Sequence, residues 1–222
     1  MPLTVVSFAT YLTSIATKWR DEDYAAYKFV KAVKGKPFKS SSYIPVVGTL
    51  RYLAMGNANN SLGWFAEMGY QYLGEKQTPG PLVLVPLPNS PCAVDTNILP
   101  RTFFQAQALA QRLNNTTVLD CLRWKVAKES ASGGSGSRDP QALYDNLAVT
   151  AQVPQNTRLI IIDDVRTSGG HLKAARAMLL AHNGYCDSAI CAGRTVHNQN
   201  EEPFSRLEEE IDDWWPMLSF FS

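Results

Sequence analysis

The chain has 222 residues, of which 45% are hydrophobic, and its formal net charge at pH 7 is +1. This length suits one large α/β domain or one domain with a smaller accessory region, and the apolar content gives no sign of global disorder. The near-neutral charge provides no bulk attraction toward nucleic acid or an anionic membrane. The cysteines lack C-x-x-C spacing, which argues against a zinc site and favours reduced thiols in a cytoplasmic protein. They are Cys92, Cys121, Cys186 and Cys191.

The first 75 residues are predicted to be helical or irregular and to form an accessory region. Residues 1–20 lack an early positive segment, and no run of about 18 apolar residues occurs, so we interpret this stretch as a helix packed on the body rather than a signal peptide. Residues 21–35 begin with acids, carry apolar residues at helical spacing and close on Gly35, which predicts a helix. Residues 61–75 predict a second, amphipathic helix with an aromatic face.

From residue 80 onward, short apolar runs alternate with amphipathic stretches. Strands are predicted at residues 81–88, 116–122, 158–163 and 185–193. Helices are predicted at residues 101–113 and 170–184, the second ending in an Asn183–Gly184 cap. Strands that alternate with helices indicate an α/β fold with a doubly wound, mainly parallel sheet and helices on both faces.

A polar segment separates the second and third predicted strands. It contains SASGGSGS at residues 130–137, which cannot bury apolar surface. The segment is either a slack surface linker or a lid that closes over a site, since long loops in compact domains are often functional. Basic residues on both sides favour a lid that meets anions, and they are Lys125, Lys128 and Arg138.

Residues 160–171, IIIDDVRTSGGH, combine an apolar run with two adjacent acids, Asp163 and Asp164, and a small glycine-rich loop. If the run is a central parallel strand, its carboxyl end opens into the crevice where doubly wound sheets bind ligands. The following helix would then point its N-terminal amides into that crevice, where they suit a phosphate. The small residues that would approach or bond the phosphate are Thr167, Ser168, Gly169 and Gly170.

The acid pair requires a ligand with more than a phosphate. Carboxylates accept hydrogen bonds from vicinal hydroxyls and can hold Mg²⁺, so a ribose phosphate with Mg²⁺ would satisfy every group in the stretch. The chain has no P-loop and no dinucleotide fingerprint, and too little chain follows Asp164 for a phosphorelay receiver. A purely structural strand, turn and helix cap would leave the acids unexplained.

These residues resemble the phosphoribosyl-pyrophosphate (PRPP) signature of the type I phosphoribosyltransferases. The shared order is an apolar run, two acids and a Thr/Ser-Gly-Gly loop, with His171 where that family usually has Thr. Residues 101–110, RTFFQAQALA, resemble the R-G-F-N-Q-A-x-x-L-A segment of the ComF-like phosphoribosyltransferases. Thr102 and Phe104 depart from its Gly and Asn, and the N-terminal zinc-binding cysteines of that group are absent.

The resemblance covers about residues 80–195. It includes Arg138, Asn146 and Leu147, which match a later segment of the ComF-like group. Outside this range, residues 28–35 are similar to the upstream Lys-Gly stretch of that group. It implies a type I phosphoribosyltransferase-like core at residues 76–200 with a flexible loop at 125–140. Residues 1–75 would form a hood-like accessory region and residues 201–222 an acidic-aromatic tail.

The same resemblance implies a transferase that binds PRPP with Mg²⁺ and displaces pyrophosphate with a nitrogen acceptor. Asp163 and Asp164 would hold the ribose hydroxyls, and residues 166–171 would cradle the 5′-phosphate. Arg101 and a lid cation would balance the departing charge. The pyrophosphate would meet a loop with a strained or cis peptide, made of Leu87, Pro88 and Asn89.

Two residues of the signature keep alternative roles. Arg166 is either a solvated loop charge or a phosphate clamp, and His171 either caps the helix or contacts the phosphate. The acids of the tail are expected to form one solvated helix face. Its apolar residues are expected to dock on the chain's own body, on a second subunit or on another protein, and they are Trp214, Trp215, Met217, Leu218, Phe220 and Phe221.

Three functions therefore stay open. The leading one is an Mg²⁺-dependent, PRPP-using transferase of nucleotide metabolism. The second is a regulatory protein that senses PRPP without turnover, favoured by the departures at Thr102, Phe104 and His171. The third is a component of a nucleic-acid-handling system, which the ComF-like resemblance permits. The residues do not identify the acceptor.

Overall fold

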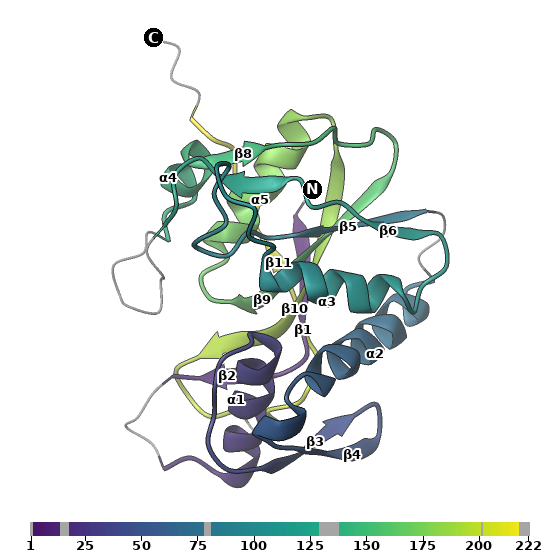
Figure 1. The fold of residues 1–222 in the computed structure, drawn as a ribbon, viewed down its shortest axis with the longest axis vertical. Helices are drawn as coiled ribbons and strands as arrows, with labels where there is room; N and C mark the ends of the chain where they lie inside the picture. Colours follow the sequence, from purple (N-terminus) through teal and green to yellow (C-terminus); the bar gives the residue numbers. More distant parts are fainter. Residues whose placement is uncertain (1, 14–17, 78–80, 129–137, 201, 218–222) are drawn as a thin grey trace.

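The computed structural model describes residues 2–13, 18–77, 81–128, 138–200 and 202–217. Its centre is a seven-stranded sheet in the order β11-β1-β10-β9-β5-β6, with β2 beside β10 (Figure 1). All strand pairs in this sheet are parallel except β1 with β11, which confirms the predicted mainly parallel sheet. The strands are β1 (Leu3–Ser7), β2 (Thr10–Leu12), β5 (Leu82–Pro86), β6 (Thr116–Val118), β9 (Arg158–Arg166), β10 (Tyr185–Val196) and β11 (Leu207–Ile211).

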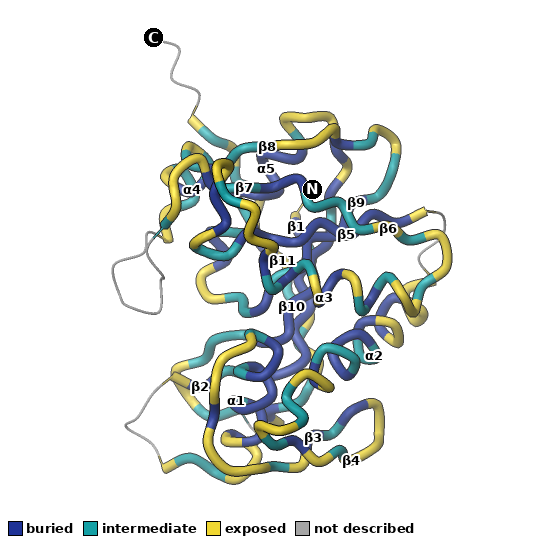
Figure 2. The backbone as a smooth tube through the Cα atoms, viewed as in Figure 1, coloured by how far each residue is buried: buried dark blue, intermediate teal, exposed yellow. Residues whose placement is uncertain are grey.

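Helices cover both faces of this sheet. They are α1 (Asp21–Val33), α2 (Asn60–Glu75), α3 (Arg101–Ala110), α4 (Pro140–Asp145) and α5 (Gly170–Ala181). One apolar cluster joins α1, α2 and α3 to the sheet, and a second joins α4 and α5 to its other face. Along β9, Ile160 and Ile162 enter the first cluster while Leu159 and Ile161 enter the second, so the strand is buried on both sides. Figure 2 shows this burial running through the central strands.

Two antiparallel pairs complete the fold. Strands β3 (Ser42–Val46) and β4 (Thr49–Leu53) form a hairpin in the N-terminal third, joined through the 3₁₀ turn η1 (Met55–Asn57) to α2. Strands β7 (Leu122–Trp124) and β8 (Leu147–Val149) pair across the 125–140 segment and bring its two ends together. Residues 129–137 of the predicted lid lie outside the described residues.

The N-terminal helix predicted for residues 1–20 is wrong, because this stretch supplies β1 and β2. Strand β1 carries Thr4, Val5 and Val6, whose branched side chains favour extended backbone, and it lies between β10 and β11. The sheet therefore takes an inner strand from the region expected to be accessory.

The acidic tail is also corrected, since Leu207–Ile211 form the edge strand β11 and not a helix face. Glu208 and Glu210 are exposed while Ile211 is buried, which is the alternation of a strand with one covered face. Beyond β11 the chain packs on its own α4 and α5: Trp214 contacts the Tyr144 ring, and Asp213 pairs with Arg176. Leu218, Phe220 and Phe221 lie outside the described residues.

Two further sequence features have structural counterparts. Cys92, Cys121, Cys186 and Cys191 are all free and buried. Among the residues described, no helix has the length and apolar character required to cross a membrane.

Replacing Val5 with Ala tests the placement of β1. Val5 is 1% exposed, so the change should lower the free energy of unfolding by about 2 kcal/mol. Val94→Ala, at a position that is 50% exposed, is the matched control and should change stability by less than about 0.5 kcal/mol in the same urea titration. Equal effects of the two substitutions would show that β1 is not an inner strand.

Candidate functional site

The acid pair lies where β9 leaves the apolar core. Asp163 is paired in register with Cys191 of β10, and its Oδ1 accepts the backbone N–H of Asp164 at 2.8 Å. Asp164 is only 8% exposed, and its Oδ1 accepts a hydrogen bond from Lys34 Nζ at 2.8 Å. Burial and the neighbouring Asp164 charge raise the pKa of Asp163 above its usual range, and the Lys34 charge opposes this shift.

Lys34 is a site residue to which sequence reasoning gave no role. It is the C-cap of α1 and precedes Gly35, whose positive φ of 67° ends the helix. Burial disfavours its charged form, but the ion pair with Asp164 holds the pKa of Lys34 above its ordinary value. In the sequence, Lys34 is marked by the Lys-Gly pair at the end of a predicted helix, within the stretch of residues 28–35 noted above.

The acid pair of the free chain is already engaged by a cation. The Lys34 ammonium occupies one lone pair of Asp164 Oδ1 and offsets part of the negative charge that would attract Mg²⁺. Within the described residues, no group of three or more His, Cys, Asp or Glu side chains could hold a metal. The arrangement suits hydroxyl donors, which can share a carboxylate with an ammonium.

Arg101 binds helix α1. Its Nε donates to the Val33 carbonyl at 2.9 Å and its Nη2 to the Ala32 carbonyl at 3.4 Å, so the guanidinium caps the last carbonyls of the helix. Its backbone N–H donates to Asn89 Oδ1 at 2.5 Å. In this structure Arg101 therefore links the loop after β5 to the end of α1.

The loop Leu87, Pro88 and Asn89 is fixed against the start of α3. Thr102 donates its hydroxyl to the Leu87 carbonyl at 2.5 Å. The expected cis peptide is not found, since the peptide bonds of the described residues are all trans. The loop thus receives its shape from α3.

His171 and Lys128 meet at the start of α5. Lys128 Nζ lies 3.1 Å from His171 Nε2 and 4.1 Å from the centroid of the Trp124 ring. The indole Nε1 of Trp124 in turn donates to the Asn89 carbonyl at 3.1 Å. Burial lowers the pKa of Lys128 to about 8, and burial together with the Lys128 charge lowers the pKa of His171 to about 4. At neutral pH the ring is therefore neutral and accepts a hydrogen bond from the ammonium.

The small residues before α5 form a constricted turn. Gly169 has φ +83°, and a Cβ there would lie 2.8 Å from Ile211 Cδ1. A Cβ on Gly170 would collide with the Arg138 carbonyl oxygen, so the chain entering α4 packs directly on this helix start. Thr167 and Ser168 are exposed, and neither hydroxyl bonds to another residue of the described chain.

Arg166 forms an ion pair with the edge strand and is not a solvated loop charge. Its Nη1 lies 2.5 Å from Glu209 Oε2 on β11, and Arg194 Nη2 approaches Glu209 Oε1 at 2.9 Å. The Nε of Arg166 is buried and has no hydrogen-bond partner among the described residues. Arg166 thus ties the end of β9 to the edge strand.

The three predicted lid cations separate. Lys125 Nζ donates to the Asp145 carbonyl at the end of α4, at 2.8 Å, whereas Lys128 reaches His171. Arg138 contacts α5 through its backbone. The two ends of the 125–140 segment reach the start of α5 through the Lys128–His171 pair and through the Arg138 backbone beside Gly170.

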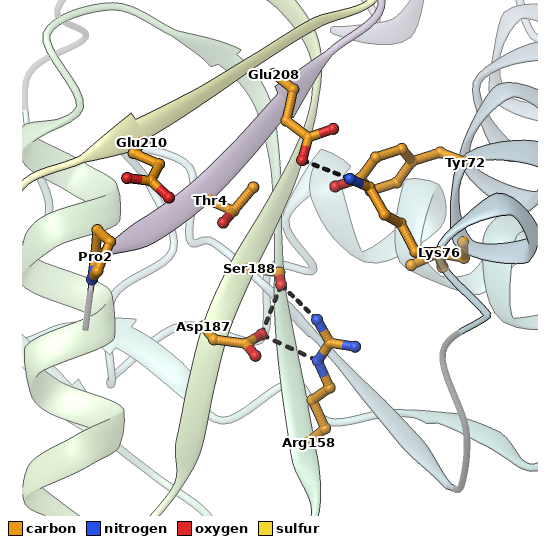
Figure 3. Close-up of a pocket in the computed structure, with 10 residues that line it drawn as sticks. Pro2, Thr4, Tyr72, Lys76, Arg158, Asp187, Ser188, Glu208 and Glu210 are labelled. Atoms are coloured by element: carbon orange, nitrogen blue, oxygen red, sulfur yellow. Dashed lines mark hydrogen bonds and ion pairs between the residues drawn. The ribbon is translucent and has the colours of Figure 1, made fainter.

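One pocket lies elsewhere, at the amino ends of the parallel strands (Figure 3). Its volume is about 380 Å³, and its charges are largely paired: Lys76 with Glu208, and Arg158 with Asp187. A second cavity of about 300 Å³ lies beside the end of α1, where Gly35 and Lys36 face Met55. Neither cavity was predicted from the sequence.

No protein-family model and no curated protein matches the sequence. Solved structures of similar arrangement include an adenine phosphoribosyltransferase with a TM-score of 0.45 and 14% identity, covering 75% of this chain and 89% of that chain. The adenine phosphoribosyltransferase of Saccharomyces cerevisiae has a TM-score of 0.43 and 13% identity, covering 75% of this chain and 88% of that chain. The adenine phosphoribosyltransferase of Thermoanaerobacter pseudethanolicus has a TM-score of 0.42 and 19% identity, covering 69% of this chain and 83% of that chain. All three are phosphoribosyltransferases.

The depressed pKa of His171 predicts a specific pH dependence of stability. The folded chain keeps the ring neutral down to about pH 4, so unfolding takes up a proton below the ordinary value of 6.5 and this stability is lost as the pH falls. Relative to His171→Gln, the wild-type free energy of unfolding should fall by up to about 3 kcal/mol between pH 6.5 and 4. Parallel curves for the two proteins in urea titrations would contradict the burial of a neutral ring.

Proposed function

We propose that the chain is a phosphoribosyltransferase-like protein that binds PRPP and displaces pyrophosphate with a nitrogen acceptor. The observation that supports the proposal is that three groups follow one another from the end of β9 to the start of α5: the Asp163–Asp164 pair, the small-residue turn, and His171 with its partner Lys128. Each group suits a different part of one ribose phosphate.

On the sugar side, the two carboxylates would accept the ribose hydroxyls. Asp164 is held in place by Lys34, and Asp163 by the backbone N–H of Asp164. Fixed acceptors of this kind also stabilise the positive charge that develops on the ribose as its bond to pyrophosphate lengthens. The pair therefore has a role in binding and in the transition state.

On the phosphate side, the turn Thr167–Gly170 would receive the 5′-phosphate. The free amides at the start of α5 carry partial positive charge, and the exposed Thr167 and Ser168 hydroxyls are available donors. His171, as a neutral ring, would offer a hydrogen bond rather than charge.

On the leaving-group side, Lys128 would supply the cation that balances pyrophosphate. Its ammonium is half-buried over Trp124, and Trp124 is bonded to the Asn89 carbonyl, so the cation stands close to the loop after β5. We assign Arg101 a positioning role, because its guanidinium caps α1 while its backbone holds Asn89. Mg²⁺ would arrive with the diphosphate, because the Lys34 ammonium already offsets part of the charge of the acid pair.

A regulatory protein that binds PRPP without turnover is the second candidate. The observation that favours it is that two groups expected to act on the leaving group and the sugar are already engaged: Arg101 with α1, and Asp164 with Lys34. Pyrophosphate release, measured across a panel of bases and amines, separates the two functions. PRPP binding without release on any acceptor would favour the sensor, and no PRPP binding would contradict both.

Asp164→Asn tests the ligand site directly. The substitution weakens a charged acceptor for the ribose hydroxyls, so the affinity for PRPP in calorimetry should fall by about 10- to 100-fold. Asp95→Asn, at an exposed position, is the matched control and should keep the wild-type affinity. Unchanged PRPP binding by a folded Asp164→Asn protein would remove the acid pair from the site.

A further inference from the structure

The ion pair between Lys34 and Asp164 joins residues 130 positions apart in the sequence. Lys34 Nζ lies 2.8 Å from Asp164 Oδ1, and the side chains are 26% and 12% exposed. Such a partly buried pair is screened less by salt than a surface pair. The contact is therefore a defined part of the site.

The backbone that carries Lys34 is fixed by several contacts. Its own N–H donates to Val30 at 3.0 Å, and the N–H of Gly35 donates to Ala32 at 2.9 Å. Arg101 bonds the carbonyls of Ala32 and Val33 and is itself held by Asn89. A continuous set of hydrogen bonds thus runs from the loop after β5, through the end of α1, to the ammonium at the acid pair.

The charges at this point decide what the free acid pair can bind. Asp163 and Asp164 with Lys34 carry at most one net negative charge, whereas the two carboxylates alone would carry up to two. A divalent cation would bind the acid pair more tightly if the pair carried two negative charges and if the Asp164 lone pair occupied by Lys34 were free. A ribose hydroxyl requires neither, because it needs only an oriented acceptor.

We infer that Lys34 is the built-in counter-cation of the acid pair: it orients Asp164 for a ribose diol and keeps divalent cations off the carboxylates of the free chain. This role rests on the proposed function only in naming the diol as the ligand. It makes Lys34 a positioning residue that determines the ligand specificity of the pair.

Lys34→Gln separates the two effects. Without the ammonium, Mn²⁺ should bind the ligand-free protein at least about tenfold more tightly than it binds the wild type, as measured by the electron paramagnetic resonance signal of free Mn²⁺. The gain should be lost in the double variant K34Q/D164N. Ribose 5-phosphate without metal should bind Lys34→Gln about tenfold more weakly in calorimetry, because Asp164 is no longer held.

Lys36→Gln is the matched control, because Lys36 is exposed and only two positions away. It should leave both affinities unchanged. Opposite changes in Mn²⁺ and ribose 5-phosphate affinity distinguish a specificity role from a merely structural one, which would weaken both. Equal Mn²⁺ affinity in the wild type and Lys34→Gln would overturn the inference.

Two further measurements keep the outcomes separate. If Lys34→Gln does not fold, Mn²⁺ binding by the ligand-free wild-type protein tests the inference instead. Mn²⁺ binding that is lost in Asp164→Asn would overturn the inference, because the acid pair would then bind the cation in spite of Lys34. No Mn²⁺ binding by the wild-type protein would support it. If neither PRPP nor ribose 5-phosphate binds the wild-type protein, the proposed function fails. The Mn²⁺ titrations would still show whether Lys34 prevents divalent cations from binding the carboxylates.

Discussion

The structure depends on one constraint, which is that β9 is buried on both faces and yet ends on two acids. Its apolar residues alternate between the two core clusters, and this alternation places helices on both sides of the sheet. The largely buried carboxylates of Asp163 and Asp164 at the end of the strand are stable only if opposite charges and hydrogen-bond donors lie next to them. Lys34, the turn before α5 and the ion pair of Arg166 with Glu209 provide them.

Supporting contacts around the site come from elements that are distant in the sequence. Arg101 joins α3 to the end of α1, and Asn89 joins the loop after β5 both to α3 and to Trp124. As a result, hydrogen bonds from Asn89 connect the elements that carry Lys34, the partner of Asp164, and Trp124, the ring beneath Lys128. A ligand that contacts either pair would therefore meet groups whose positions are already fixed.

The elements with a strong period or a clear end signal could be predicted from the sequence. Local sequence signals are sufficient at three places. They are the apolar run of β9, the acidic start of α1, and Asn183, which has φ 62° just after α5. Strand β1 has β-branched residues that favour extended backbone, but its place inside the sheet is set by pairing with β10 and β11. Strand β11 also forms by pairing with β1. Likewise, the acid pair could be found in the sequence, but its partner Lys34 could not, since nothing local indicates a contact across 130 positions.

The way the sheet ends has a consequence for the folded chain's behaviour toward its own copies. One border is β6, which has only three residues, and the other is β11, whose outward side chains include Glu208 and Glu210. Short or acidic borders resist the addition of further strands from neighbouring molecules. Loss of the segment that forms β11 would expose the edge of β1. The unpaired backbone N–H and C=O groups of its apolar LTVVS segment could then pair with a strand of another molecule. The acidic C-terminal strand thus protects the solubility of the sheet it completes.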